Sequence, residues 1–234
     1  SAGITDKLLD VVAREPRVLP YLDMPIQHGS DTVLARMRRP ERTRTIRDRV
    51  QKLRAAVPEI AIRTTCIVGF PGETDQQFEE LLEFLQEIQF DRVGAFTYSP
   101  QEGTRAAAYP DDVHETVKRE RLERLTELQR AITAERYESR IGRSVLALVD
   151  RCDSETNTCQ ARLPWQADDI DGVTHLDEAL PPGTFAEVAV EEVVDDYDFQ
   201  ASVIRVATLA STPPTPRLGR QLPIQQTTIG SFGR

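Results

Sequence analysis

The feature that most constrains the fold is an apolar strand that leads directly into a capped helix. Residues Ile60–Val68 are rich in β-branched side chains, which is typical of a buried strand. The stretch GFPGE follows, and Thr74 and Gln77 then have the spacing of a capping box. Apolar residues recur behind it at helical spacing: Phe78, Leu81, Leu82, Leu85 and Ile88. This unit predicts an α/β fold with a parallel sheet.

The same alternation extends over the first 140 residues. We expect helices at Asp6–Arg14, at Ser30–Arg38 and at about Asp112–Arg140. A further helix is expected before Pro58, with one apolar face formed by Ile46, Val50, Leu53 and Val57. We expect further strands at Tyr21–Ile26 and Arg92–Tyr98. Three strands are fewer than a complete (β/α) barrel contains, so the sequence predicts part of such a barrel, open or barrel-like, in residues 1–141.

The pattern changes after Gly142 to short alternating strands joined by polar turns. They are expected at Arg143–Asp150, Gly172–Leu176, Gly183–Val194 and Phe199–Val206. This predicts a small all-β, OB-like barrel in residues 142–208. Residues 209–234 are rich in Thr, Pro, Gln, Ser and Gly, and we expect a disordered tail because little apolar surface offsets the entropy of ordering.

Composition indicates a soluble, cytoplasmic protein. Hydrophobic residues make up 39% of the chain, and neither an apolar run long enough for a membrane span nor a secretory signal peptide is visible. The three cysteines, Cys66, Cys152 and Cys159, are too few for a disulfide scaffold, which favours a reducing compartment. Pairing of Cys152 with Cys159 across a hairpin is the less favoured alternative.

The net charge of −9 is unevenly distributed. Residues 143–208 contain four Arg and fourteen Asp and Glu, a net charge of −10, whereas the first 142 residues carry −2 and the last 26 carry +3. Such an acidic segment repels phosphate backbones and attracts basic partners. The alternative is that these carboxylates only keep the domain soluble.

Three strand ends carry candidate ligand-binding residues, because ligands collect at the carboxyl ends of parallel strands. These ends are Pro25–Asp31, Thr64–Thr74 and Thr97–Thr104. The glycines of the second end allow a ligand to approach the backbone, and Glu73 lies beside free amides of the next helix. An ordinary β-to-α turn accounts for the same residues.

Single residues of special chemistry give weaker indications. His28 has no other ligand at metal-binding spacing, so a polar turn residue is favoured over a ligand or base. Cys66 is expected to pack in the core. The arginine-rich segment Arg36–Arg54 suggests nucleic-acid contact, but its arginines fall on solvated helix faces without interleaved aromatics, so RNA contact is disfavoured.

Three stretches together resemble the carboxyl-side part of a radical S-adenosylmethionine (SAM) domain of the methylthiotransferase family. They are YLDMPIQHGSDTVLARMRRP, RTTCIVGFPGET and GAFTYSPQEGTRAA. The following LQRAITAERYESRIGRSVLALVD resembles the family's link into its small TRAM barrel. DDIDGVTHL and VVDDYDFQASVI are similar to the branch that modifies an aspartate of small-subunit ribosomal protein S-twelve. The resemblance covers roughly residues 5–207.

The resemblance implies a transferase that inserts a methylthio group at the β-carbon of that aspartate by radical SAM chemistry. It implies SAM and a [4Fe-4S] cluster as cofactors, and the ribosomal protein or the small ribosomal subunit as partner. Carried over residue by residue, the SAM site comprises Gln27, Ser30, Arg63, Ile67, Val68, Gly69, Phe96 and Tyr98. Arg63 would pair with the SAM carboxylate. Glu73 either meets the ligand or only fixes the turn, and no residue is assigned a catalytic role.

The sequence departs from the family at the cluster. The family's CxxxCxxC loop is absent, and Cys66, Cys152 and Cys159 are far apart, so no metal ligand is assigned. We therefore expect the chain to be part of a longer enzyme, inactive alone, whose partner is the missing amino-terminal part. Two alternatives stay open: a transfer-RNA adenosine methylthiotransferase, and a non-catalytic binding module.

Overall fold

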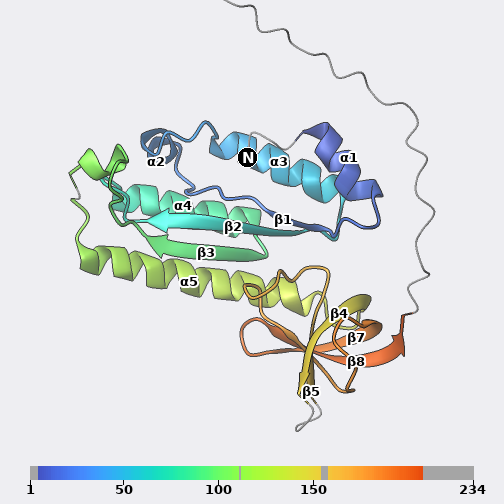
Figure 1. Ribbon diagram of the computed structural model, residues 1–234. Coiled ribbons are helices and arrows are strands. Elements are labelled where there is room, and N and C mark those ends of the chain that lie inside the picture. The colour runs from blue at the N-terminus through green and yellow to red at the C-terminus, as the bar shows by residue number, and fades with distance from the viewer. Residues whose placement is uncertain (1–4, 111, 154–157, 208–234) are drawn as a thin grey trace, which may run out of the picture.

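The structure is a computed structural model that describes residues 5–110, 112–153 and 158–207. A three-stranded sheet with helices packed against it comes first, and a small β-barrel follows at the far end of a long helix (Figure 1). The tail predicted for residues 209–234 lies outside the described residues. Across the described ranges, none of the helices combines the length and apolar character that a membrane span requires.

The first region alternates strands and helices as the sequence predicts. Its elements are α1 (Asp6–Arg14), β1 (Tyr21–Asp23), α2 (Asp31–Arg36), α3 (Thr43–Ala56), β2 (Ala61–Val68), α4 (Asp75–Ile88), β3 (Arg92–Thr97), the 3-10 helix η1 (Ala106–Ala108) and α5 (Glu115–Glu138). The strands are parallel in the order β1–β2–β3. The expected partial α/β architecture is confirmed.

Strand β1 ends earlier than the sequence predicts. Pro25 has no N–H and interrupts the ladder, so regular pairing stops after Asp23. The chain nevertheless stays beside β2, because the Gln27 N–H donates to the Thr65 carbonyl and the Ile67 N–H donates to the Gln27 carbonyl, each at 2.9 Å. The end of β1 is therefore fixed against the end of β2.

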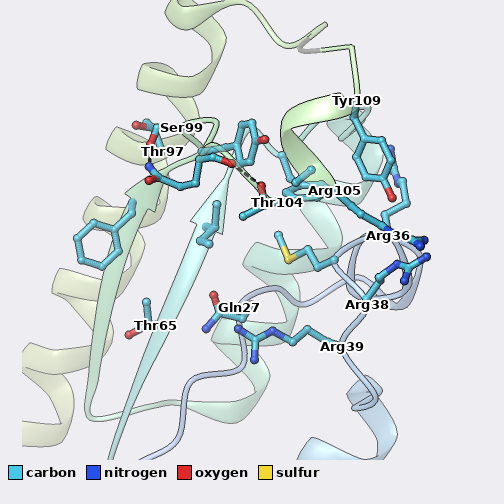
Figure 2. A pocket seen from close by; sticks show the side chains of 17 residues that line it. Gln27, Arg36, Arg38, Arg39, Thr65, Thr97, Ser99, Thr104, Arg105 and Tyr109 are labelled. Carbon is cyan, nitrogen blue, oxygen red and sulfur yellow. Dashed lines mark hydrogen bonds between the residues drawn. The ribbon is translucent and has the colours of Figure 1, made fainter.

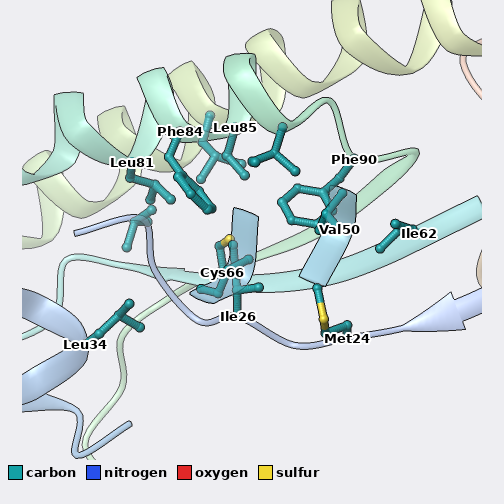
Figure 3. Close-up of a cluster of buried hydrophobic side chains, with 14 of the residues drawn as sticks. Met24, Ile26, Leu34, Val50, Ile62, Cys66, Leu81, Phe84, Leu85 and Phe90 are labelled. Atoms are coloured by element: carbon teal, nitrogen blue, oxygen red, sulfur yellow. The ribbon is translucent and has the colours of Figure 1, made fainter. Parts of the chain in front are cut away.

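Alternation along β2 gives the sheet two different faces. Ile62 and Cys66 are fully buried and point to a core formed with α3 and α4. Arg63, Thr65 and Ile67 point to the opposite face and are only partly buried. The helix-side core also contains Met24, Ile26, Leu34, Val50, Leu81, Phe84, Leu85 and Phe90 (Figure 3). One face is thus sealed, and the other is available for a ligand.

Helix α5 is joined to the sheet by buried polar contacts, which compensate for its largely polar sequence. The Asp91 carboxylate accepts hydrogen bonds from Arg136 at 2.9 Å, from Arg140 at 2.8 Å and from the Ile62 N–H at 2.9 Å. The hydroxyl of Thr133 donates to the Asp91 carbonyl at 3.0 Å. Because buried charges are costly unless paired, Asp91 fixes α5 to the start of β3.

The second region is a closed five-stranded barrel. Its strands are β4 (Ser144–Asp153), β5 (Thr158–Arg162), β6 (Thr174–Leu176), β7 (Phe185–Val194) and β8 (Asp198–Val206), in the order β4–β5–β6–β8–β7. The expected small barrel is confirmed, although β5 was not predicted as a strand. Only Cys159 and Ala161 of its five residues are fully buried, so its alternation is hidden among polar residues.

The barrel docks at the amino ends of the sheet strands. The Tyr21 hydroxyl donates to the buried Asp171 carboxylate at 2.5 Å, and Arg92 Nε lies 3.4 Å from its other oxygen. Arg92 also donates to the Ile170 carbonyl at 3.1 Å and stacks over the Tyr197 ring. Burial and the neighbouring Asp171 raise the pKa of Tyr21, so its hydroxyl stays a donor. The carboxyl ends of the strands are left free.

Candidate functional site

A pocket of about 630 Å³ lies at the carboxyl ends of β2 and β3. Its apolar wall includes Ile67, Phe70, Phe96 and Tyr98, and Figure 2 shows the pocket from close by. Its polar lining comes from Gln27, Arg36, Arg38, Arg39, Thr65, Thr97, Ser99, Gln101, Thr104, Arg105 and Tyr109. Apolar walls with a few converging polar groups are the common composition of a small-molecule site.

Gln27 enters the pocket from a strained backbone position. Its φ of 74° lies in the left-handed region, which is uncommon for a residue other than glycine. The hydrogen bonds to Thr65 and Ile67 hold this conformation, and Gln27 forms an isolated parallel bridge with Cys66. Strained residues of this kind cluster at functional sites, where the surrounding structure fixes them.

The GFPGE turn after β2 is fixed by Glu73. Its carboxylate accepts the Phe70 N–H at 3.1 Å and pairs with Arg121 at 3.1 Å. Gly69 adopts a φ of 71°, and a Cβ there would lie 2.3 Å from Cγ of Lys118, whose stem covers the turn. Glu73 is buried, so it shapes the turn that carries Phe70 and does not line the pocket.

His28 joins the first strand end to this turn. The ring is fully buried, and Nδ1 accepts the Ser30 N–H at 3.0 Å. Nε2 lies 3.5 Å from a Glu73 carboxylate oxygen. His28 therefore connects the QHGS and GFPGE segments behind the pocket, which agrees with the favoured interpretation of a polar turn residue.

The end of β3 supplies aromatic rings. Phe96 lines the pocket with 57% of its surface exposed, an unusual state for a phenylalanine. Tyr98 is buried, and its ring packs edge-on against Phe70 with centroids 5.2 Å apart. Phe70 also meets Tyr109, with centroids 6.3 Å apart. An exposed ring beside a fixed aromatic wall offers a surface on which a flat heterocycle can stack.

Four of the eight residues predicted for the SAM site line this pocket: Gln27, Ile67, Phe96 and Tyr98. The other four lie outside its lining. Ser30 is buried at the N-cap of α2, Val68 points into the helix-side core, and Gly69 shapes the turn. Arg63 is held by Asp23 at 2.6 Å and lies 3.8 Å from Asp171, towards the barrel. The role in SAM binding remains a prediction for all eight.

Sequence reasoning missed the arginines at the pocket. Arg38 and Arg39 belong to the segment interpreted as solvated helix surface, and Arg105 was not considered. The available signal was that Arg38 and Arg39 follow a short helix directly after the QHGS strand end. Thr97, Ser99 and Thr104 fall within the third strand end that the sequence singled out.

The three cysteines do not converge on the pocket. Cys66 is fully buried on the helix side of the sheet, where burial raises the pKa of its thiol to about 12. Cys152 and Cys159 lie opposite each other on β4 and β5, with Cα atoms 4.1 Å apart, and are joined as a disulfide. The less favoured alternative for this pair is therefore the one observed. Within the described residues, no group of three or more His, Cys, Asp or Glu is arranged to hold a metal ion.

Family models match both regions of the chain. Residues 1–85 match the model of the Radical SAM superfamily, and residues 141–204 match that of the TRAM domain. The first region of the chain is thus similar to the Radical SAM superfamily, and the second to the TRAM domain. The predicted resemblance is thereby confirmed, and the pocket is lined by residues within the radical SAM match, in 27–70, and beyond it, in 96–109.

Curated relatives are similar over most of this chain. The ribosomal protein uS12 methylthiotransferase RimO of Acinetobacter baylyi is 43% identical over 207 residues, which cover 87% of this chain and 46% of the relative. The protein of the same name from Thiobacillus denitrificans is 49% identical over 189 residues, 80% of this chain and 42% of the relative. The chain thus spans less than half the length of these relatives.

A solved structure also resembles part of the chain. The Escherichia coli coproporphyrinogen III oxidase HemN, described as a radical SAM enzyme, matches with a TM-score of 0.45 and 20% identity. The match covers 54% of this chain and 30% of that chain.

Proposed function

We propose that this chain supplies the SAM-binding pocket and the TRAM domain of a methylthiotransferase that acts on ribosomal protein uS12, the small-subunit protein S-twelve. The observation that carries the proposal is the aromatic pocket at the strand tips, formed by residues that the family resemblance also selects. The relatives named for this activity support it. We place the reaction in the cytoplasm, where ribosomes are found.

The pocket fits SAM by size and by the chemistry of its walls. A volume of about 630 Å³ is within the range of cofactor sites. The exposed ring of Phe96 offers a face for adenine, and Gln27 and Thr65 offer polar contacts. When bound, SAM supplies hydrogen abstraction and the methyl group, while this chain binds the nucleoside, orients it and excludes water from the apolar wall.

The cluster that radical SAM chemistry requires does not fit the cysteines of this chain. Cys66 faces the wrong side of the sheet, and Cys152 and Cys159 are paired in the barrel. Several thiolates must converge to hold a [4Fe-4S] cluster. We therefore propose that the cluster is provided outside these 234 residues, by a further part of the enzyme that is this chain's partner.

The substrate proposal depends on charge as well as similarity. Residues 143–208, which include the barrel, carry a net charge of −10. A ribosomal protein is basic and is attracted to such a surface, whereas transfer RNA is repelled. RNA contact is therefore disfavoured, and the methylthiotransferases that modify transfer RNA are the alternative that binding must exclude.

Equilibrium dialysis with SAM tests the pocket. Phe96→Ala should weaken SAM binding about tenfold, because loss of one stacked ring costs roughly 1–3 kcal/mol. Leu146→Ala is the matched control, since Leu146 is similarly exposed but lies in the barrel. Equal affinity of the Phe96→Ala variant and the unaltered chain would contradict the assignment of this pocket.

Affinity for purified uS12 and for transfer RNA at moderate salt tests the substrate. We expect the chain to bind uS12 more tightly, and the preference to shrink as salt screens the barrel carboxylates. Tighter binding of transfer RNA would overturn the substrate proposal while leaving the SAM pocket in place.

A further inference from the structure

The pocket is strongly cationic although the chain as a whole is acidic. Among the residues that the structure describes, four arginines line it, Arg36, Arg38, Arg39 and Arg105, and no aspartate, glutamate or lysine does. The whole chain has 38 acidic and 29 basic residues, so four arginines and no carboxylate among the described lining residues are not what its composition favours. Figure 2 shows Arg36, Arg38 and Arg39 together on one side of the pocket, across from Thr65 and Thr97 on the strands.

One of these arginines is part of the framework. Arg36 donates to the Pro71 carbonyl at 2.9 Å and to the Gln77 side chain at 2.8 Å. It ties α2 to the GFPGE turn and to the first turn of α4. The guanidinium of Arg36 is therefore occupied by the framework around the pocket.

The other three arginines have free guanidinium groups. In the part of the chain that the structure describes, the side chains of Arg38, Arg39 and Arg105 make no hydrogen bond or ion pair. Several other arginines of the fold are engaged, as in the pairs of Arg47 with Glu87 and Arg140 with Asp91. We call Arg38, Arg39 and Arg105 the arginine rim.

The backbone under the rim is fixed while its side chains are not. Arg38 adopts a φ of 57°, again in the left-handed region. The Arg38 N–H donates to the Ala35 carbonyl, and the Arg39 N–H donates to the Leu34 carbonyl. The Arg39 carbonyl accepts from the Arg42 side chain at 2.7 Å. The hydrogen bonds from the Arg38 and Arg39 N–H groups form the Schellman pattern that commonly ends a helix, and they fix the backbone of these two residues beside the pocket.

SAM by itself does not account for the rim. At neutral pH its sulfonium and ammonium groups outweigh its single carboxylate, so the molecule is cationic overall. Three further positive charges at the mouth oppose that charge. The rim therefore suits a second, anionic ligand that approaches the SAM pocket from outside.

We propose that the arginine rim binds the side-chain carboxylate of the aspartate to be modified. This inference rests on the proposed function. The β-carbon that receives the methylthio group is bonded directly to that carboxylate, so a guanidinium that holds the carboxylate also positions the β-carbon at the pocket mouth. Arginine suits this task because its planar fork binds a carboxylate through two parallel hydrogen bonds. The rim thus selects aspartate over asparagine.

Binding of uS12 to the full chain tests the proposal. The probe is uS12 itself, compared with uS12 in which the modified aspartate is replaced by asparagine. Replacing all three rim residues with Gln should weaken binding of unaltered uS12 about tenfold and abolish its advantage over the asparagine form. Arg→Lys at the same positions should restore part of the affinity, because the charge returns without the fork. Arg119→Gln is the matched control, an exposed arginine on α5 away from the pocket.

The outcomes separate this inference from the proposed function. If the Gln variant still binds unaltered uS12 more tightly than the asparagine form, the rim does not bind the aspartate carboxylate and the inference is overturned. If the variant loses affinity for SAM in dialysis and keeps its affinity for uS12, the rim serves the SAM carboxylate and the inference is again overturned. If the rim instead accounts for affinity towards transfer RNA, the anion is a phosphate. Failure of the unaltered chain to bind SAM or uS12 contradicts the proposed function itself.

Discussion

The α/β region and the barrel bury their strands in different ways. In the first, three parallel strands form an open sheet, with helices on one face and the pocket at the tips. In the second, five strands close on themselves around one interior. Closure removes free edges, whereas an open parallel sheet leaves its strand tips accessible. Ligand binding is therefore expected at the open sheet, whereas the closed barrel is suited to contact a partner as a rigid unit.

The two regions also differ in charge. The described part of the pocket lining contains four arginines and no carboxylate, whereas residues 143–208 carry a net charge of −10. The positive and negative surfaces lie at opposite ends of the strands, since the barrel docks at their amino ends through Asp171. A protein client with a basic body and one acidic target side chain complements both.

Thiol reactivity should show the largest contrast between the regions. In the reduced, folded chain at pH 8, Cys66 should react with iodoacetamide about a thousandfold more slowly than in the unfolded chain, because burial raises its pKa from near 9 to about 12. Partly buried Cys152 should react first. The raised pKa lowers stability as pH rises from 9 to 12, where only the unfolded thiol ionises. Mass spectrometry of labelled peptides measures the labelling rate of each cysteine. Labelling of Cys66 as fast as Cys152 would contradict the predicted protection of Cys66.

Core truncation tests whether the regions unfold separately. Phe199→Ala in the barrel and Phe78→Ala in α4 should each cost about 3–5 kcal/mol, because both rings are fully buried. The only tryptophan, Trp165, packs 6.0 Å from the Phe199 ring and reports on the barrel. In denaturant titrations, Phe199→Ala should lower the midpoint of the tryptophan fluorescence transition more than Phe78→Ala does. Phe78→Ala should lower the midpoint of the helical circular dichroism transition more than Phe199→Ala does. Equal shifts of both signals in both variants would show one cooperative unit.

Asp171→Asn tests the contact between the regions. The substitution removes a buried charge that accepts from Tyr21 and neutralises Arg92, so we expect a loss of about 2 kcal/mol. Asp168→Asn in the same loop is the control, because Asp168 is 61% exposed and its loss should change stability by less than about 0.5 kcal/mol. Equal melting temperatures for the two variants would mean that Asp171 does not hold the barrel to the sheet.

The surface ion pair between Arg47 and Glu87 should contribute least to the free energy of unfolding. Arg47 donates to both oxygens of Glu87, but both side chains are about half exposed, so Arg47→Ala should cost less than about 1 kcal/mol. The hydrogen bond from Arg47 lowers the pKa of Glu87. The contribution is therefore present above the ordinary glutamate pKa and disappears as pH falls through the lowered value. Melting curves at pH 7 and pH 3 should differ between variant and unaltered chain only at pH 7.

Local sequence patterns predicted most of the elements. The expected helix Asp6–Arg14 and the capping box of Thr74 with Gln77 are observed as predicted. Strand β2 begins one residue later than expected. These features depend on contacts between residues close in sequence, which is why periodicity and capping reveal them. The strand β5 was missed because its inward residues, Cys159 and Ala161, are small and its other residues polar.

The candidate site was predicted only in part. Gln27, Ile67, Phe96 and Tyr98 were selected because three strand ends and a family pattern point to them, and they do line one pocket. Which side of a strand a residue occupies, and which distant carboxylate pairs with it, depends on long-range packing. Arg63 was expected at the SAM carboxylate, but Asp23 and Asp171 hold it near the barrel.

The sequence by itself determined the order of strands and helices, the change to a barrel after Gly142 and the cysteine spacing that cannot hold a cluster. Only the tertiary structure decided that Arg38, Arg39 and Arg105 meet at one pocket mouth while the barrel takes the opposite end of the strands. The physical reason is the distance along the chain over which each kind of interaction acts. Hydrophobic periodicity and helix capping involve residues close in sequence, whereas these charged side chains come together only when the folded sheet brings separate loops to the same edge.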